Sequence, residues 1–247
     1  MRVVKIISTF IILVFVAQLK AQEFSVGFRY GFGHYSMTEL DHLQNLRKEA
    51  ADFRLKTTES FPITPNYRLE FAVNNLGFID KIALYSAYGS TGARSTLSDY
   101  SGRVDLDAVI SSYQAGLSLQ KIFWKNNHFS TGAYVEGGWI QSKFKTLDFL
   151  ELYPPAYFKY SSEYSFNSQG KTVEPGLALK YALNPFLFQL NLGYLIDLSG
   201  KYFLKDDKEQ WLAIGNKDIR QQWTGYRIGL QVSYLFKNKK KLVVSSD

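Results

Sequence analysis

His34 and His42 are the residues of this chain best suited to proton transfer, because an imidazole changes its charge near neutral pH. If they converge with Ser98 or Asp99, they would mimic an acyl-transfer or lipid-deacylation site, in which a histidine takes a serine proton. No local motif joins these four residues, so solvated loop positions are the simpler interpretation. The third histidine, His128, lies at an expected short turn, and no His, Asp or Glu cluster has metal-ligand spacing. We therefore expect no enzyme, and no catalytic, cofactor-binding or metal site.

A second set of charged residues alternates with apolar residues, which would place these charges together inside a barrel. Five cations and four carboxylates nearly balance: Arg29, Arg68, Lys81, Lys180 and Arg227 against Glu70, Glu136, Glu174 and Asp197. Charges in a narrow interior must be hydrated or paired, and an eight-stranded barrel is just wide enough for side chains to fill it. The sequence therefore predicts a lumen filled by an ion-pair network rather than a selective pore, which more often shows one sign of charge.

The elements that position these charges are segments in which apolar and polar residues alternate. A period of two predicts a β-strand with one face toward lipid and the other toward the lumen. In 226–236, for example, Tyr226, Ile228, Leu230 and Val232 lie on the face opposite Arg227. The expected strands cover residues 23–35, 65–74, 78–89, 108–123, 128–143, 171–183, 186–199 and 226–236. Residues 157–166 either extend the sixth strand above the membrane or add a further pair, which would give ten strands.

The connections between these strands alternate strictly between short and long. Short turns lie near 74–77, 124–127 and 183–185, and long loops cover about 36–64, 90–107, 144–170 and 200–221. This alternation is typical of an up-and-down barrel with tight periplasmic turns and long outer loops. The prediction is an all-β fold, an eight-stranded antiparallel transmembrane β-barrel with both termini in the periplasm. The tryptophans are expected as interface anchors near strand ends: Trp124, Trp139, Trp211 and Trp223.

The first long loop departs from strand chemistry. Leu40, Leu43, Leu46 and Phe53 recur at helical spacing within residues 38–55, and Thr38 is a candidate N-cap. We expect a short amphipathic helix here that covers the barrel mouth or lies on the bilayer surface. A role in holding a ligand is the alternative, because loops often carry function.

The two ends of the chain have their own composition. Residues 1–21 have the basic start, apolar centre and small final residue of a secretory signal peptide, with too few apolar residues for a comfortable membrane span. An uncleaved anchor helix is the alternative. Residues 22–236 are expected to form the barrel and 237–247 a basic periplasmic tail. The formal net charge of +7 comes largely from these ends, so it is no evidence for nucleic-acid binding, and the chain has no cysteine.

Several segments resemble a known family. These are Leu19-Lys20-Ala21-Gln22, Phe24-Ser25-Val26-Gly27, Gly33-His34-Tyr35-Ser36-Met37 and the stretch from Gly225 to Phe236. The chain is similar to the small outer-membrane β-barrel domain family of Bacteroidota, often labelled porin-family or PorT-like. The resemblance implies that Phe236 is the terminal aromatic read by the barrel-assembly machinery, although eleven residues follow it here.

These patterns lead to a functional expectation. We expect a monomeric, non-enzymatic barrel of the Gram-negative outer membrane, with a side-chain-filled lumen. It would act through its extracellular loops, or as an envelope-structural or assembly component. Its partners would be the lipid bilayer and envelope or secretion-system proteins, with no nucleic acid and no cofactor. A small-solute porin and a lipid-modifying enzyme using His34 and His42 are the alternatives.

Overall fold

The computed structural model describes residues 23–51, 54–154, 157–205, 207 and 209–237. The predicted signal peptide and nearly all of the predicted basic tail therefore lie outside the described residues. The elements in chain order are β1 (Glu23–Tyr35), α2 (Thr38–Ala50), β2 (Lys56–Ser60), β3 (Thr64–Asn74), β4 (Lys81–Asp99), β5 (Gly102–Lys125), β6 (Phe129–Leu152), β7 (Phe158–Leu183), β8 (Phe186–Ser199), β9 (Phe203–Leu204), β10 (Ala213–Ile214), β11 (Lys217–Asp218) and β12 (Gly225–Lys237).

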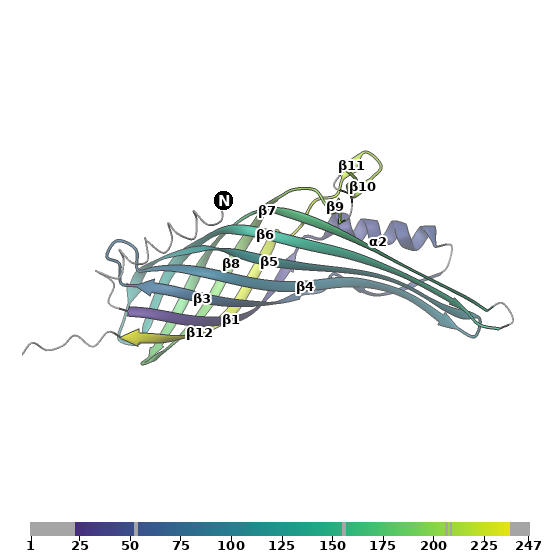
Figure 1. Cartoon of the computed structure of the whole chain (residues 1–247). Helices are drawn as coiled ribbons and strands as arrows, with labels where there is room; N and C mark the ends of the chain where they lie inside the picture. Colours follow the sequence, from purple (N-terminus) through teal and green to yellow (C-terminus); the bar gives the residue numbers. More distant parts are fainter. Residues whose placement is uncertain (1–22, 52–53, 155–156, 206, 208, 238–247) are drawn as a thin grey trace, which may run out of the picture.

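Eight of these strands form a closed antiparallel ring (Figure 1). The order around it is β1, β3, β4, β5, β6, β7, β8 and β12, and β12 pairs with β1 to close it. Glu23 lies opposite Lys237, so the first and last strands begin and end at the same rim. The three short connections also lie at this rim. The predicted eight-stranded up-and-down barrel is confirmed, and residues 158–166 extend a ring strand rather than adding two more strands to the ring.

The side chains of the ring sort by parity. On β12, Tyr226, Ile228, Leu230 and Val232 are 39–71% exposed, whereas the intervening Gln231 is 1% exposed. An exposed apolar face and a buried polar face are the reverse of a soluble sheet, and match a barrel whose outer face meets lipid. No helix in the described part of the chain is long and apolar enough to cross a membrane.

Four ring strands continue well beyond the barrel. Thr91, Ile110, Phe144 and Phe166 form one level of β4, β5, β6 and β7 through their pairing. Beyond this level, residues 92–99, 102–109, 145–152 and 158–165 form a curved four-stranded extension, here called the outer sheet (Figure 1). At ~3.3 Å per residue it projects about 25 Å.

Residues 90–107 and 144–170, expected as loops, are therefore mainly paired strands. Residues such as Val104, Leu106 and Ala108 keep the period of two, and their side chains are buried on the face that packs against Leu40 of α2 and Leu55. Because successive strands pair with each other here, their backbone N–H and C=O groups are hydrogen-bonded, as they would not be in irregular loops.

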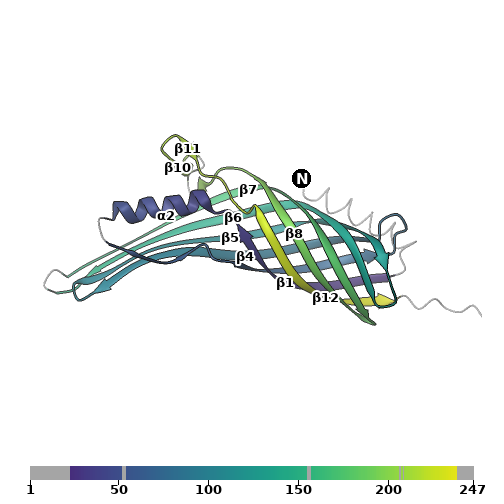
Figure 2. The same cartoon turned by 180° about the vertical axis from the view of Figure 1, so that it is seen from behind.

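Helix α2 lies over this extension (Figure 2), and strand β2 pairs along one of its edges. The side-chain amide of Gln44 donates to the carbonyl oxygen of Leu106 at 2.8 Å, and Arg47 forms an ion pair with Asp148. Strand β2 pairs with residues 93–96 of β4 and so extends the sheet at that edge. The predicted helix exists and ends at Ala50. Phe53 lies outside the described residues. The N-cap of the helix is Met37 with no side-chain cap hydrogen bond, so Thr38 does not cap it.

Replacing Leu40 tests the helix as a cover of the barrel. The Leu40 side chain is 0% exposed among apolar neighbours, so Leu40→Ala should lower the free energy of unfolding by about 3 kcal/mol, as cavity formation does. The measurement is urea unfolding in lipid vesicles. His42→Ala on the exposed side of the same helix is the control, with a change below about 0.5 kcal/mol. Equal effects of the two substitutions would contradict this packing.

Candidate functional site: the closed lumen and its outer plug

The half of the lumen nearer the rim with the short connections, here called the inner half, is filled by a network of charged side chains. Glu70 of β3 contacts Lys81 of β4 and lies 2.8 Å from Arg68 and 2.9 Å from the side-chain amide of Gln231. Arg68 also forms an ion pair with Glu136 of β6, whose carboxylate is 3.5 Å from Arg29 of β1. Since β3 and β6 are separated by two strands in the ring, the Arg68–Glu136 pair crosses the lumen.

A second part of the network centres on Glu174 of β7. Its carboxylate accepts hydrogen bonds from Arg227 of β12 and from the Tyr134 hydroxyl, both at 3.0 Å. Arg227 also donates to Gln114 at 3.1 Å and to the Tyr35 hydroxyl at 2.8 Å. The space left between Arg29, Asn66, Tyr134, Glu174, Asn191 and Arg227 is too small for a water molecule. The inner lumen is thus closed by paired side chains.

The nine charged residues expected in the lumen do not all have the same role. Seven are at most 5% exposed, and the Arg227 side chain is 9% exposed. Lys180 is buried near the inner end of β7, and no carboxylate in the described part of the chain lies within ion-pair distance of it. Asp197 lies at the outer end of β8, where its carboxylate accepts the backbone N–H of Trp223 at 3.1 Å.

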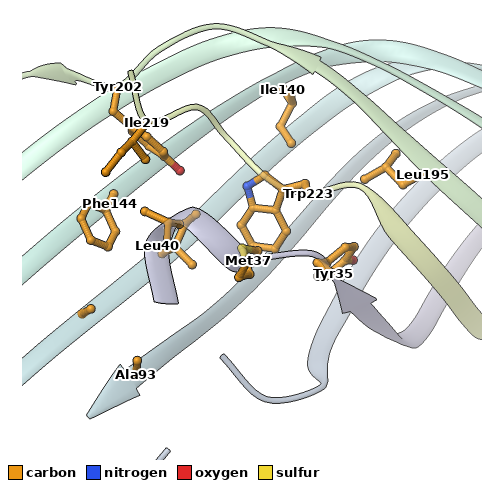
Figure 3. Close-up of a cluster of buried hydrophobic side chains, with 12 residues drawn as sticks. Tyr35, Met37, Leu40, Ala93, Ile140, Phe144, Leu195, Tyr202, Ile219 and Trp223 are labelled. Atoms are coloured by element: carbon orange, nitrogen blue, oxygen red, sulfur yellow. The ribbon is translucent and has the colours of Figure 1, made fainter. Parts of the chain in front are cut away.

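The outer half of the lumen is closed by apolar side chains that the sequence analysis missed. Figure 3 shows this outer plug, in which Trp223 lies beside Tyr35, Met37 and Leu40. Its other members are Ala93, Ala108, Ile110, Ile140, Phe144, Leu195, Tyr202 and Ile219. The Tyr202 side chain is fully buried among them. The segment between β8 and β12 thus turns inward and fills the mouth.

Trp223 is the central residue of the outer plug and corrects one expectation. It is 1% exposed, its ring lies 5.0 Å from that of Tyr35, and its indole N–H donates to the Ser142 hydroxyl at 2.6 Å. It is therefore a lumen residue and not an interface anchor. Trp223 lies two residues before β12, and alternation assigns a residue to a face only inside a strand, so no sequence pattern placed its side chain in the lumen. Trp124, Trp139 and Trp211 are 42–51% exposed.

The structure does not bring together the residues of the possible acyl-transfer site. His34 is exposed on β1, and His42 is exposed on α2. The strand pairs Gly33–Thr64 and Asn66–Gly89 show which part of β4 lies at the same height in the barrel as His34. That part precedes Asp99 by roughly seven residues, or about 23 Å along the strand. Ser101 and Gly102 donate to the Asp99 carboxylate, and these hydrogen bonds lower its pKa. Among the described residues, no three His, Asp or Glu gather as a possible metal site.

Comparisons with known proteins give similarities of architecture only. No family model matches the sequence, and no curated protein matches it. Among solved structures, the attachment invasion locus protein Ail of Yersinia pestis is 14% identical with a TM-score of 0.34, over 87% of this chain and 99% of that chain. A major outer membrane protein from Thermus thermophilus is 10% identical with a TM-score of 0.45, over 86% and 99%. The N-terminal β-barrel domain of Pseudomonas aeruginosa OprF is 11% identical with a TM-score of 0.31, over 87% and 98%. Because each of these TM-scores is below 0.5, the fold stands on this chain's own strand pairing.

Removing one buried carboxylate tests the lumen network. Glu136→Gln keeps the shape of the side chain but leaves Arg29 and Arg68 without their shared carboxylate. A broken buried pair should lower the free energy of unfolding by about 3 kcal/mol, measured by urea unfolding in vesicles.

The matched control is Glu163→Gln. Glu163 is exposed on the outer sheet, and its hydrogen bond with Lys145 lowers its pKa. Water screens such a pair, so the unfolding midpoint should hardly change. A Glu136→Gln protein as stable as this control would show that the lumen charges are hydrated rather than paired.

Proposed function

We propose that this chain is a non-enzymatic outer-membrane protein whose closed barrel carries an outer sheet away from the cell surface. The observation that carries the proposal is the division of the lumen into a charged inner network and an apolar outer plug, with no room for a water molecule around Arg29 and Arg227. A lumen of this kind leaves the elements outside the membrane as the parts that can meet other molecules. Residues 92–99, 102–109, 145–152 and 158–165 are the largest such element.

The same geometry supports a proposed orientation in the membrane. The short connections, the start of β1 and the end of β12 share one rim, and the outer sheet and α2 lie at the other (Figure 1). In an outer-membrane barrel, short turns face the periplasm and long segments face outward. We place the termini in the periplasm, residues 1–21 as a signal peptide, and residues 237–247 as a periplasmic tail.

The partners belong to the same proposal. The apolar outer face takes the lipid bilayer as its surroundings, and a single closed ring needs no second copy within its own membrane. Envelope or secretion-system proteins are the partner class, met through the outer elements. Membership in the Bacteroidota PorT-like family is part of this proposal and rests on the sequence segments alone.

Phe236 is proposed as the aromatic that the assembly machinery reads. It lies at the inner end of β12 and is 51% exposed. Its ring packs edge-on against that of Tyr234, with the ring centres 4.8 Å apart. An exposed aromatic at the end of the closing strand can be recognised before the ring closes.

The conductance of the purified protein tests the closed lumen. In a planar bilayer, wild-type protein should give no large steady conductance, because ions have no hydrated path past Arg68, Glu136 and Trp223. A wide porin, reconstituted in parallel, controls for insertion. Stable openings with the wild-type protein would overturn the closed-lumen function and favour a small-solute porin.

Replacing Phe236 tests the assembly role. Phe236→Ala should reduce the amount of folded protein in the outer membrane several-fold, measured as the heat-modifiable band on gels. The matched control is Phe71→Ala, because Phe71 is 54% exposed on the same outer face of the barrel but lies in β3. Equal losses with both variants would assign the effect to lipid contact rather than to assembly.

A further inference from the structure

The outer sheet has one covered edge and one open edge. At the β4 edge, β2 pairs with residues 93–96. At the β7 edge, pairing with β8 begins at Gly170, and β9 pairs only with Phe166 and Asn167. In the described part of the chain, no strand pairs with this side of residues 158–164. A strand edge exposed in this way is a template for another strand.

The direction of the free backbone groups follows from neighbouring hydrogen bonds. The carbonyl oxygens of Ser165 and Gln169 accept from the backbone N–H groups of Lys205 and Gly200, on the side away from β6. Successive residues of a strand point their N–H and C=O groups to alternate sides. The free groups of the open edge therefore belong to Lys159, Ser161 and Glu163.

The open edge is self-complementary about Ser161. If two copies pair antiparallel with Ser161 opposite Ser161, then Lys159 lies opposite Glu163 of the second copy, and Phe158 lies opposite Tyr164. The three pairs formed by residues 159, 161 and 163 use only the free groups, so each residue exchanges two backbone hydrogen bonds with its partner. Shifting the register to Tyr160 or Ser162 separates Lys159 from Glu163.

The side chains already lie where this pairing needs them. The Lys159 ammonium lies 5.3 Å from the centre of the Phe149 ring, and Glu163 bonds to Lys145 at 2.7 Å, both on the face of the sheet opposite α2. Phe158, Tyr160 and Tyr164 are each 48–51% exposed on the other face. Lys159 alone would protect the edge, because charge on an edge strand discourages pairing. When Glu163 of a second copy lies opposite Lys159, the two charges attract each other, so this partner is not discouraged.

We propose that residues 158–164 of β7 pair antiparallel with the same segment of a second copy of this chain. In β7 the chain runs from the tip of the outer sheet toward the barrel (Figure 2). An antiparallel partner runs the opposite way, so the two barrels lie at opposite ends of the joined sheet. Given the outer-membrane location proposed above, the pair joins two facing membranes. Each barrel stays single in its own membrane, and many weak contacts add up between two cell surfaces.

Single cysteines test the register, since the chain has no cysteine of its own. In Ser161→Cys, the two sulfurs meet across the two-fold axis, where Cα atoms about 5.5 Å apart suit a disulfide. In Ser162→Cys, the two copies are diagonal neighbours about 7–8 Å apart, which is too far. Purified full-length protein in detergent, oxidised with copper-phenanthroline, should form the covalent dimer at least tenfold faster with Ser161→Cys. Equal rates, or no dimer with Ser161→Cys, would overturn the proposal.

Exchanging the charges of Lys159 and Glu163 distinguishes the proposed register from non-specific association. In the Ser161→Cys background, Lys159→Glu and Glu163→Lys should each slow dimer formation about tenfold, because like charges then face each other. The double variant restores opposite charges and should restore the rate. If the double variant stays slow, or the single variants stay fast, the proposed pairing is wrong.

A mixing experiment tests the facing-membrane arrangement separately. Two cell populations carry Ser161→Cys proteins with different tags and are mixed before oxidation. Dimers that contain both tags support pairing between cells. Dimers in detergent together with none between cells would overturn the membrane geometry, and with it the outward placement of the outer sheet. The conductance result would not be affected.

Discussion

The ion pair between Arg68 and Glu136 is the interaction on which the rest of the barrel depends. It joins β3 to β6 across the lumen, while Arg68 also bonds to Glu70 and covers the Tyr85 ring at 4.0 Å. Buried charges are costly unless each has a partner, so these residues can be inside only if they meet. These side chains can reach one another across the lumen only if the ring is as narrow as one of eight strands. Once they fill such a ring, no path for solutes is left. Barrel width, charge pairing and the closed lumen are therefore one constraint.

The interior changes character along the same strands because its surroundings change. On β6, Tyr134 and Glu136 serve the charged network, whereas Ile140 and Phe144 belong to the outer plug. Toward the outer mouth, α2 and the segment before β12 are close enough to cover apolar side chains, and burial from water stabilises them. Trp223 joins the two regions, since its neighbour Tyr35 also accepts from Arg227. Helix and lumen thus form one packed unit.

Much of the fold was predictable because parity is strict inside the membrane. The bounds of β1 and β8 match the alternation to the residue, and the buried charges follow from it. Outside the membrane, lipid no longer demands an apolar face. Arg94 and Asp107 therefore occupy positions at which an apolar residue would have indicated a strand. For this reason the strands of the outer sheet were predicted as loops. The inward turn of Trp223 depends on contacts between distant segments, such as its bond to Ser142, which no local pattern contains.

Extending only four of eight ring strands has a geometric consequence. A closed ring has no edges, which is how barrels avoid unwanted pairing. Above the level of Thr91 and Phe166, β4 loses β3 and β7 loses β8 as neighbours, so two edges reappear. The chain covers one with β2, at the cost of ordering an extra segment. At the other it leaves residues 158–164 open and places Lys159 and Glu163 there, four residues apart. A single cation at this edge would face the same cation of a second copy and oppose pairing in any register. With Lys159 and Glu163 both present, opposite charges face each other in the proposed register and are separated in the shifted ones.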